Sequence, residues 1–233
     1  GNVVAGRIAN RLNLGGTNTV VDAACASSLS AIHTACLELA SGRCDLCVSG
    51  GVDTLNDIFM HMCFSKTGVL SHTSDAKPFS KDADGTVLGE GIGMVVLKRL
   101  EDAVKDSDKI YAVIKGVGTS SDGTTGGIYA PDAGGQLRAL KDAYSQACID
   151  PHTVELFEAH GTGTRVGDKI EMTALKSLFA DNYADSNSAP SESDTMLTAS
   201  TAKPIAKIDD INKHRNYAAV GSVKSMIGHA KAA

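Results

Sequence analysis

The sequence of 233 residues is poor in aromatic side chains, which make up 4% of it, and it contains no tryptophan. It also lacks an excess of basic residues, because 22 Lys and Arg stand against 27 Asp and Glu, a net charge of −5. Such a chain has no positive field that would hold nucleic acid. No apolar run approaches the roughly 18–20 residues of a membrane span. We therefore expect neither a nucleic-acid partner nor a membrane-spanning segment.

The six cysteines lack the spacing of a small disulfide-rich domain, since they are scattered through apolar contexts. Reduced thiols in a cytoplasmic protein are the expected state. Cys44 and Cys47 form a CxxC pattern, but they are predicted to lie along one strand, whose alternation would send them to opposite faces. No second pair offers metal-ligand spacing, so neither a zinc site nor a redox pair is expected.

Strands and helices are predicted to alternate along the chain, as in an α/β protein. The first half is expected to hold a strand ending at 20–21, a helix over 25–41 and a strand over 44–51, a βαβ unit with parallel pairing. The other predicted segments are strands at 93–100, 109–118, 154–159 and 218–223, and helices at 137–147, 170–179 and after 223. Residues 181–216, rich in Ser, Asp, Asn, Ala and Pro, are expected to be an exposed insertion.

Cys25 lies in "VVDAACASSL", between a predicted strand and a predicted helix. The unpaired N–H groups and the dipole at a helix N-terminus favour a thiolate, so Cys25 is a candidate nucleophile. A packed core cysteine fits the same local sequence, since free cysteine is among the most buried residue types. The local residues leave both interpretations open.

Three more candidates follow predicted strands. His160 opens the loop "HGTGTRVGD", while Lys224 and His229 lie in "GSVKSMIGH". Taken singly, each could be a structural histidine or a solvated lysine. Together with Cys25 they supply a nucleophile, hydrogen-bond donors for an oxyanion and a cation, the set that acyl-thioester chemistry needs. By contrast, "GEGIG" at 89–93 precedes its strand and lacks a P-loop lysine, so tight packing explains it better than phosphate binding.

Four motifs in order, "VVDAACASSLSAIH", "KPFSKDADGTVLGEGIGMVVLKRL", "EAHGTGTRVGD" and "GSVKSMIGH", resemble the β-ketoacyl synthase (ketosynthase) domain of polyketide and fatty-acid synthases. "GRIANRLNLGGTN", "GGVDTLNDIFMHMCFSKT" and "KGVGTSSDG" resemble the ketosynthases of bacterial multidomain synthases that make polyunsaturated fatty acids. The resemblance implies a thiolase-like fold of two βαβαβ halves in an α-β-α-β-α sandwich. Residues 1–108 would belong to the N-terminal half and 109–233 to the C-terminal half.

The resemblance also implies roles for individual residues. Cys25 matches the acyl-accepting nucleophile of the family, and His160 and His229 match its two histidines, which assist malonyl decarboxylation and bind the thioester oxyanion. Lys224 matches the lysine of the "KSxIGH" motif, and Glu171 matches the ion-pair partner of that lysine. Two further residues, Thr162 and Thr164, match the threonines that hydrogen-bond the pantetheine arm. No metal is implied.

The implied activity is that of an acyltransferase of the 3-oxoacyl-acyl carrier protein synthase type, which needs no cofactor of its own. Its substrates would arrive on the phosphopantetheine of an acyl carrier protein. The implied partners are that carrier, a second copy in a homodimer, and the acyltransferase, ketoreductase and dehydratase domains of a multidomain synthase.

Three other functions fit the sequence less well. A thiolase would lack both "EAHGTGT" and "KSxIGH", and a Cys–His thioesterase or amidase would leave Lys224 and His229 without roles. A chain-length-factor-like partner subunit would have lost the cysteine at position 25. The sequence departs from the family in Ala26 and Met226, and both ends resemble cuts, so we expect a piece of a longer polypeptide that is inactive alone.

Overall fold

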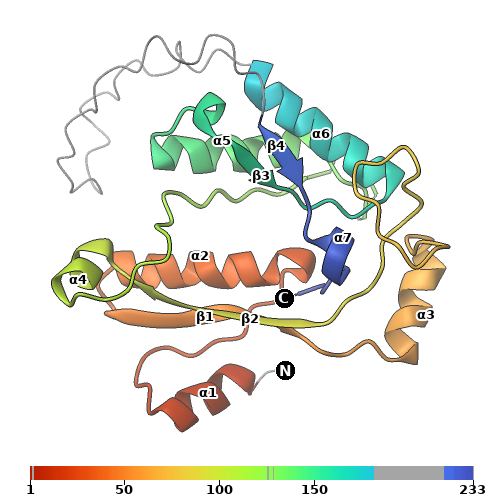
Figure 1. Cartoon of the computed structure of the whole chain (residues 1–233). Coiled ribbons are helices and arrows are strands. Elements are labelled where there is room, and N and C mark those ends of the chain that lie inside the picture. Colours follow the sequence, from red (N-terminus) through yellow and green to blue (C-terminus); the bar gives the residue numbers. More distant parts are fainter. Residues whose placement is uncertain (2, 125, 128, 181–217, 233) are drawn as a thin grey trace.

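The computed structural model describes residues 1, 3–124, 126–127, 129–180 and 218–232 (Figure 1). The insertion predicted at 181–216 lies outside the described residues. In chain order the elements are α1 (Val4–Leu12), the 3₁₀ turn η1 (Ala24–Ala26), α2 (Ser27–Ala40), β1 (Leu46–Asp53), α3 (Ile58–Thr67), β2 (Gly91–Lys98), α4 (Leu100–Lys105), α5 (Ala133–Ala147), the 3₁₀ turn η2 (Pro151–Thr153), β3 (Leu156–Glu158), α6 (Arg165–Ala180), β4 (Ala219–Gly221) and α7 (Lys224–Ile227).

The first sheet consists of β1 and β2, which α2 covers on one face (Figure 1). Ala35 and Leu39 of α2, one helical turn apart, are 7% and 6% exposed. The predicted helix and both of these strands are therefore present. The strand predicted to end at 20–21 is not formed, so its predicted parallel pairing with β1 is absent. β1 pairs instead with β2, in the antiparallel direction, with Val48 opposite Val96.

The second sheet consists of β3 and β4, which pair in parallel. α6 lies between them in the sequence, in keeping with the crossover connection that parallel strands need. Phe157 of β3 packs edge-on against Phe179 of α6, with ring centroids 5.5 Å apart, and Leu178 is 1% exposed. Helix α5 packs against α6 (Figure 1). The strand predicted at 109–118 is not formed: this stretch pairs with no other strand of the described chain.

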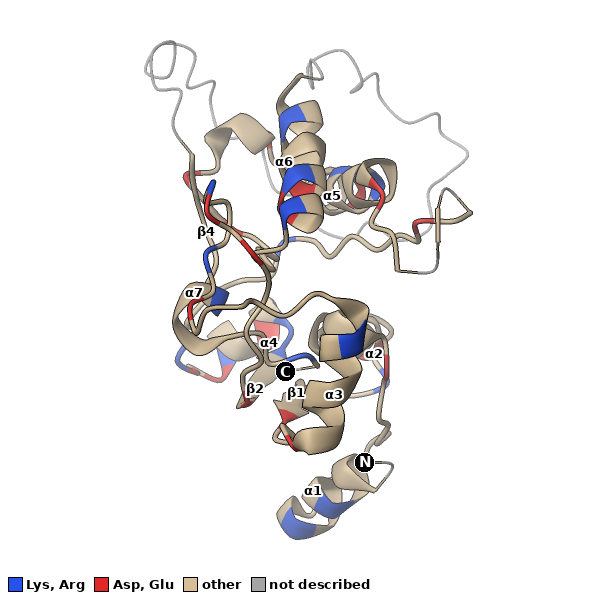
Figure 2. Cartoon of the chain, turned by 90° about the vertical axis from the view of Figure 1, so that its right-hand side faces the viewer, with Lys and Arg blue, Asp and Glu red and all other residues tan. Residues whose placement is uncertain are grey.

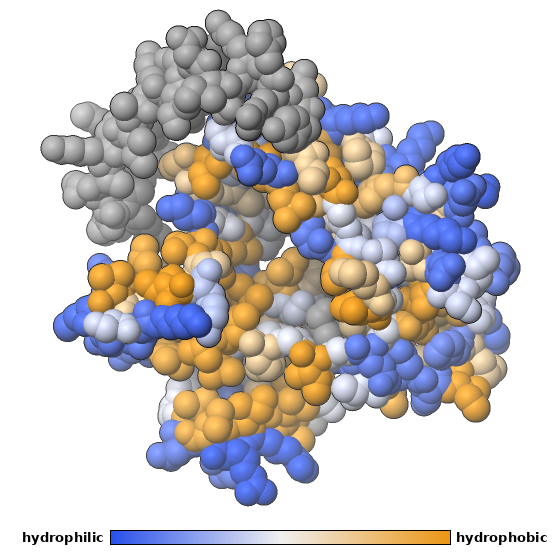
Figure 3. Space-filling model, in the orientation of Figure 1, coloured by the Kyte–Doolittle hydropathy of each residue, from blue (hydrophilic) through white to orange (hydrophobic). Residues whose placement is uncertain are grey.

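Lys and Arg positions are interspersed with Asp and Glu positions along the helices and loops (Figure 2), which agrees with the small net charge of −5. Broad apolar areas lie on the half that holds α1, α2 and the first sheet (Figure 3). On β2 the side chains of Ile92 and Val96 are 69% and 65% exposed, so this strand presents an uncovered apolar face. Within the described ranges, no helix has the length and apolar character needed to cross a membrane.

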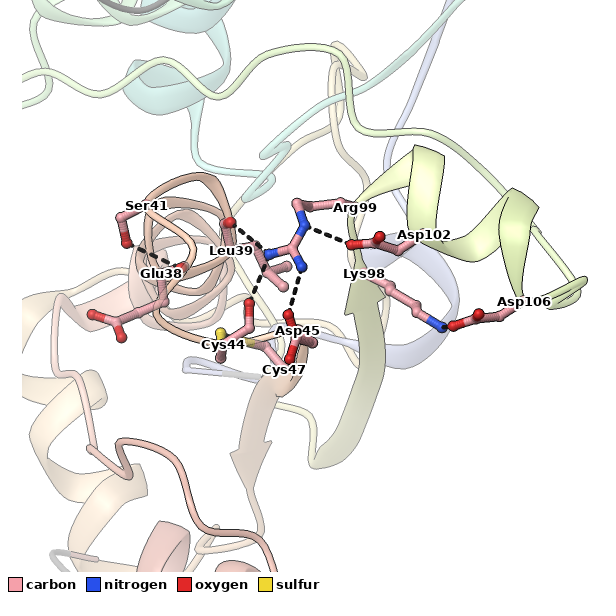
Figure 4. Close-up of polar contacts among 10 residues, drawn as sticks. All are labelled: Glu38, Leu39, Ser41, Cys44, Asp45, Cys47, Lys98, Arg99, Asp102 and Asp106. Carbon is pink, nitrogen blue, oxygen red and sulfur yellow. Dashed lines mark hydrogen bonds and ion pairs between the residues drawn. The ribbon is translucent and has the colours of Figure 1, made fainter.

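Arg99 joins the elements of the first half (Figure 4). Its guanidinium donates to the carbonyl oxygens of Leu39 and Cys44, at 3.1 and 2.8 Å, and pairs with Asp45 and Asp102, both at 2.6 Å. The end of α2, the start of β1 and the first turn of α4 are thereby held together. The hydrogen bonds to the carboxylates of Asp45 and Asp102 raise the pKa of Arg99, so its charge persists at any physiological pH.

The expected separation of Cys44 and Cys47 is wrong, because their sulfur atoms lie 3.0 Å apart. Cys44 precedes β1, which begins at Leu46, so strand alternation does not govern its side chain. Burial and the adjacent Cys44 thiol raise the pKa of Cys47 to about 12, which keeps that thiol protonated at neutral pH.

The approach of β1 to β2 yields a stability prediction. A Cβ added at Gly50 would lie 2.0 Å from the carbonyl oxygen of Gly93, whereas a Cβ added at Gly93 would meet nothing within 4 Å. We expect Gly50→Ala to lower the free energy of unfolding by about 2 kcal/mol or more, because the strands must separate. Gly93→Ala is the matched control, and denaturant unfolding of both variants measures the difference. Equal unfolding curves would contradict the close approach.

Candidate active site

Cys25 lies in the turn η1, directly before α2. The hydroxyl of Ser27 accepts the N–H of Ala23 at 2.9 Å and donates to the carbonyl of Ala24 at 2.7 Å. Ala24 has φ of +50°, a left-handed conformation that is unfavourable for a residue with a Cβ. The turn is therefore held by these local bonds, and it presents the Cys25 side chain at the mouth of the helix.

The His160 loop is fixed from α6. One carboxylate oxygen of Glu171 accepts the N–H of His160 at 2.6 Å, and the other accepts the N–H of Gly161 at 2.8 Å. Gly161 has φ of +48°, and a Cβ there would lie 2.5 Å from the Cβ of Ser222. Only glycine lets the loop pass this close to the β4 segment, and the resulting turn aims His160 at the site.

Asp168 ties this loop to the first half of the chain, a role that the sequence analysis missed. Its side chain is buried, with the residue 6% exposed, and its two oxygens accept the N–H groups of Gly163, at 3.0 Å, and Phe79, at 2.6 Å. The N–H of Gly85 also donates to the carbonyl of Gly163 at 3.0 Å. Asp168 is the last residue of the motif "HGTGTRVGD", and this position in the motif is the sequence feature that points to it.

His229 is held by backbone pairing with the segment before β2. Its N–H donates to the carbonyl of Val87 at 2.7 Å, and its carbonyl accepts the N–H of Gly89 at 3.0 Å. A Cβ at Gly89 would lie 2.1 Å from the carbonyl oxygen of Ile227. Gly89, the first glycine of "GEGIG", thus serves close packing, and here that packing places a histidine, whereas a Cβ at Gly93 of the same motif would meet nothing within 4 Å.

These segments bring the candidate residues together. The sulfur of Cys25 lies 3.2 Å from Nε2 of His229, across 204 residues of sequence. The rings of His160 and His229 meet edge to face, with centroids 5.3 Å apart and an interplanar angle of 87°. Lys224 lines a cavity of about 80 Å³ together with Cys25 and His229.

The protonation of His229 follows from its hydrogen bonds. The N–H of Lys231 donates to Nδ1 of His229 at 3.2 Å, so this nitrogen supplies its lone pair. In the neutral ring the proton then resides on Nε2, which faces the sulfur of Cys25. His229 can therefore donate a hydrogen bond toward a group bound at Cys25.

Burial, the adjacent His160 ring and the charges of Lys224 and Lys231 lower the pKa of His229 to about 4, and Asp53 opposes them. The pKa of His160 is also lowered, by burial and then by Lys224, against Glu171 and Asp168. Both imidazoles are neutral at pH 7. Burial raises the pKa of the Cys25 thiol, while its own backbone N–H and Lys224 counteract that rise.

Thr162 and Thr164 lie in the same loop, with their hydroxyl oxygens 2.9 Å apart. Thr164 also accepts the N–H of Gly167 at 3.2 Å, which caps the start of α6. Glu171 is engaged with backbone N–H groups, and these two described residues, Glu171 and Lys224, do not approach to within 4.0 Å as an ion pair. Their predicted pairing therefore differs from the geometry of this structure.

A metal ion does not fit the three converging side chains, although their donor atoms all lie within 4.8 Å of one another. A ligating histidine normally donates its other N–H to an acceptor. Nδ1 of His229 instead accepts an N–H, so Nε2 carries the proton and has no lone pair to give. The positive charge of Lys224 beside the site disfavours a cation further.

Comparison with known proteins assigns the chain to a family. The family model for the β-ketoacyl synthase N-terminal domain matches residues 1–103, and that for the C-terminal domain matches residues 111–193. The chain belongs to the β-ketoacyl synthase family and has its thiolase-like fold.

Individual relatives are parts of large synthases. The chain is 47% identical, over all of its length, to one component of the polyunsaturated fatty acid synthase of a Thraustochytrium species, and it spans 7% of that protein. It is 36% identical to polyketide synthase PksN of Bacillus subtilis, covering 96% of this chain and 4% of that protein. The ketosynthase from module 6 of the bacillaene synthase of Bacillus subtilis superposes with a TM-score of 0.82 at 37% identity, covering 98% of this chain and 36% of that one.

The lowered pKa of His229 predicts a pH-dependent stability. Since the unfolded residue, with a pKa of about 6.5, binds a proton before the folded one does, stability is lost as pH falls below about 6.5 toward 4. Between pH 7 and pH 5 the unfolding free energy of the unaltered protein falls. We expect this fall to be about 2 kcal/mol smaller in His229→Gln. Denaturant titrations at the two pH values measure it, with His72→Gln, at the exposed surface, as the control. An unchanged decrease in His229→Gln would contradict the buried neutral ring.

The position of Glu171 predicts the outcome of a double-mutant cycle with Lys224. Glu171→Ala leaves the N–H groups of His160 and Gly161 without their acceptor, and we expect it to cost about 2 kcal/mol of stability. Because the carboxylate is not paired with the lysine, the effects of Glu171→Ala and Lys224→Met should add to within about 0.5 kcal/mol. A larger coupling energy would instead support the ion pair implied by the family resemblance.

Proposed function

We propose that the protein is a β-ketoacyl synthase that condenses malonyl-acyl carrier protein with an acyl chain held on Cys25. The observation that carries this proposal is the convergence of Cys25, His160 and His229, with Nε2 of His229 at 3.2 Å from the sulfur. A thiol beside two neutral hydrogen-bond donors suits thioester exchange followed by carbon–carbon bond formation. The product would be a 3-ketoacyl chain in polyunsaturated fatty acid or polyketide biosynthesis.

The first step loads the enzyme. The sulfur of Cys25 attacks the carbonyl carbon of an acyl-carrier thioester, and the oxyanion that forms accepts the Nε2 proton of His229 as a hydrogen bond. The bond to the pantetheine sulfur then breaks, and the proton of the Cys25 thiol leaves with that thiol. Lys224 favours the reaction because its charge opposes the rise in the pKa of Cys25.

The second step forms the new bond. Malonyl-carrier loses CO₂, and the electron pair of the broken bond remains on the α-carbon as an enolate, whose oxygen accepts hydrogen bonds from His160 and His229. The α-carbon attacks the Cys25 thioester, and the thiolate of Cys25 is the leaving group. Neutral imidazoles suit this role, since they stabilise the enolate without giving it a full proton.

The proposed partners follow from this chemistry. An acyl carrier protein would present substrates on phosphopantetheine, and the hydroxyls of Thr162 and Thr164 are the proposed contacts for its arm. The domain itself would use no cofactor. The relatives are multidomain synthases, which supports further synthase domains beside this one. The proposal includes acyltransferase, ketoreductase and dehydratase neighbours, a homodimer and a cytoplasmic location. All six cysteines lie in the described ranges as free thiols, in keeping with that compartment.

The test separates loading from condensation. In the full-length protein we expect Cys25→Ala to abolish labelling by a radioactive acyl-carrier thioester, because no nucleophile remains. His160→Ala should still be labelled and should lose condensation by about a hundredfold or more, since one donor to the enolate is gone. Cys63→Ala, an exposed cysteine outside the site, is the matched control.

Labelling that survives in Cys25→Ala would refute the nucleophile. Labelling without condensation in the unaltered protein, given malonyl-carrier, would refute the proposed reaction and favour a thioesterase or a non-condensing partner subunit.

A further inference from the structure

A buried ion pair lies beside the site and takes no part in the proposed reaction. Nζ of Lys231 lies 3.0 Å from a carboxylate oxygen of Asp53, and the two side chains are 10% and 12% exposed. Nζ also donates to the side-chain oxygen of Asn56, and the second oxygen of Asp53 accepts the N–H of Ala232 at 3.3 Å. In the described part of the chain it is the ion pair with both partners most deeply enclosed.

Such a pair is a poor device for stability alone. The desolvation penalty of two buried charges offsets most of the free energy gained from their attraction. Apolar residues of similar size often give a protein of equal stability. Its supporting hydrogen bonds nevertheless fix its geometry tightly. The pair joins the end of β1, at Asp53, to the last described segment, so it fixes the position of one relative to the other.

The segment that it fixes contains His229. Lys231 has φ of +44°, a left-handed conformation unfavourable for a residue with a Cβ, and this conformation directs its N–H back to Nδ1 of His229, two residues earlier. The side chain of Lys231, anchored on Asp53 and Asn56, holds the residue in that conformation. The anchor and the hydrogen bond to the imidazole therefore belong to one residue.

We propose that Lys231, anchored by Asp53 and Asn56, is a positioning residue that keeps His229 oriented with its Nε2 proton toward Cys25. The effect of Lys231 on catalysis rests on the proposed condensing function. The effect of Lys231 on the reactivity of Cys25 does not. Neither the composition nor the motifs of the sequence point to it.

The two members of the ion pair, Lys231 and Asp53, have opposite effects on the pKa of His229. The groups that face the ring are Cys25, His160, Lys224, Lys231 and Asp53. Lys231 lowers the pKa of His229 and Asp53 raises it. Lys231→Met removes the cation and leaves Asp53 unpaired, so both changes favour the imidazolium. Asp53→Asn breaks the same pair but favours the neutral ring.

The experiment measures alkylation of Cys25 by iodoacetamide between pH 5 and 9 in the full-length protein. In the unaltered protein a neutral His229 leaves a protonated thiol at pH 6, so alkylation is slow there. In Lys231→Met an imidazolium beside the sulfur would stabilise the thiolate, and we expect the rate at pH 6 to rise about tenfold. Asp53→Asn should show no such rise, and Lys231→Arg should restore the original profile.

Condensation is the second measurement. We expect Lys231→Met to lower its rate at pH 7 about tenfold and to move the acid limb of its pH profile upward, because His229 is misplaced and more basic. Lys98→Met, which breaks an ion pair with Asp106 and Asp108 at the opposite end of the β1–β2 pair from Asp53, is the matched control and should change neither measurement.

The outcomes are distinct. Folded Lys231→Met with the alkylation profile and acid limb of the unaltered protein would overturn the proposal, as would equal shifts in Lys231→Met and Asp53→Asn. If Lys231→Met does not fold, Asn56→Ala, which keeps both charges, must still lower condensation at least about twofold for the proposal to stand. If the unaltered protein does not condense, the proposed function fails and the alkylation profiles still decide the role of Lys231.

Discussion

The contact between the sulfur of Cys25 and Nε2 of His229, at 3.2 Å, is the interaction on which the site depends. It joins the turn before α2 to the last described segment. The direction of this hydrogen bond is set at Nδ1, on the opposite side of the imidazole ring. Because the N–H of Lys231 occupies Nδ1, the imidazole has a single way to stay neutral, with its proton toward the sulfur. The backbone around His229 therefore decides what Cys25 can do.

The segment 85–89 is the template on which both histidine loops dock. Gly85 donates to the His160 loop at Gly163, while Val87 and Gly89 pair with the backbone of His229. Glycine is required where these strands of chain touch, since a Cβ at position 89 would lie 2.1 Å from a carbonyl oxygen. The two halves of the chain thus share a backbone contact at the point where their reactive side chains meet, which is how loops from different sheets achieve a fixed geometry.

The sequence allowed α2, β1, β2, α5 and α6 and the trio of Cys25, His160 and His229 to be predicted, because local periodicity and short motifs carry them. The strands expected at 20–21 and 109–118 are not formed, and α1, α3 and α4 were not predicted. The pairing of the strands could not be predicted from the sequence. The antiparallel partner of β1 begins 38 residues after β1 ends, and no local pattern determines the direction in which two such distant strands pair. Asp168 was missed because its partner Phe79 lies 89 residues away, and Lys231 because Asn56 lies 175 residues away. Roles created by such distant contacts leave no trace in residue spacing.

The positive charge of Lys224 meets two requirements of the proposed condensation. The thiol of Cys25 would lose a proton to attack, while His160 and His229 would stay neutral, because an imidazolium would protonate the enolate and end the proposed reaction. Lys224 lowers the pKa of all three groups, against burial at the cysteine and together with burial at the histidines. A carboxylate in its place would act in the wrong direction on every one of them. The proposed chemistry therefore requires a positive charge at position 224, whatever the length of the acyl chain.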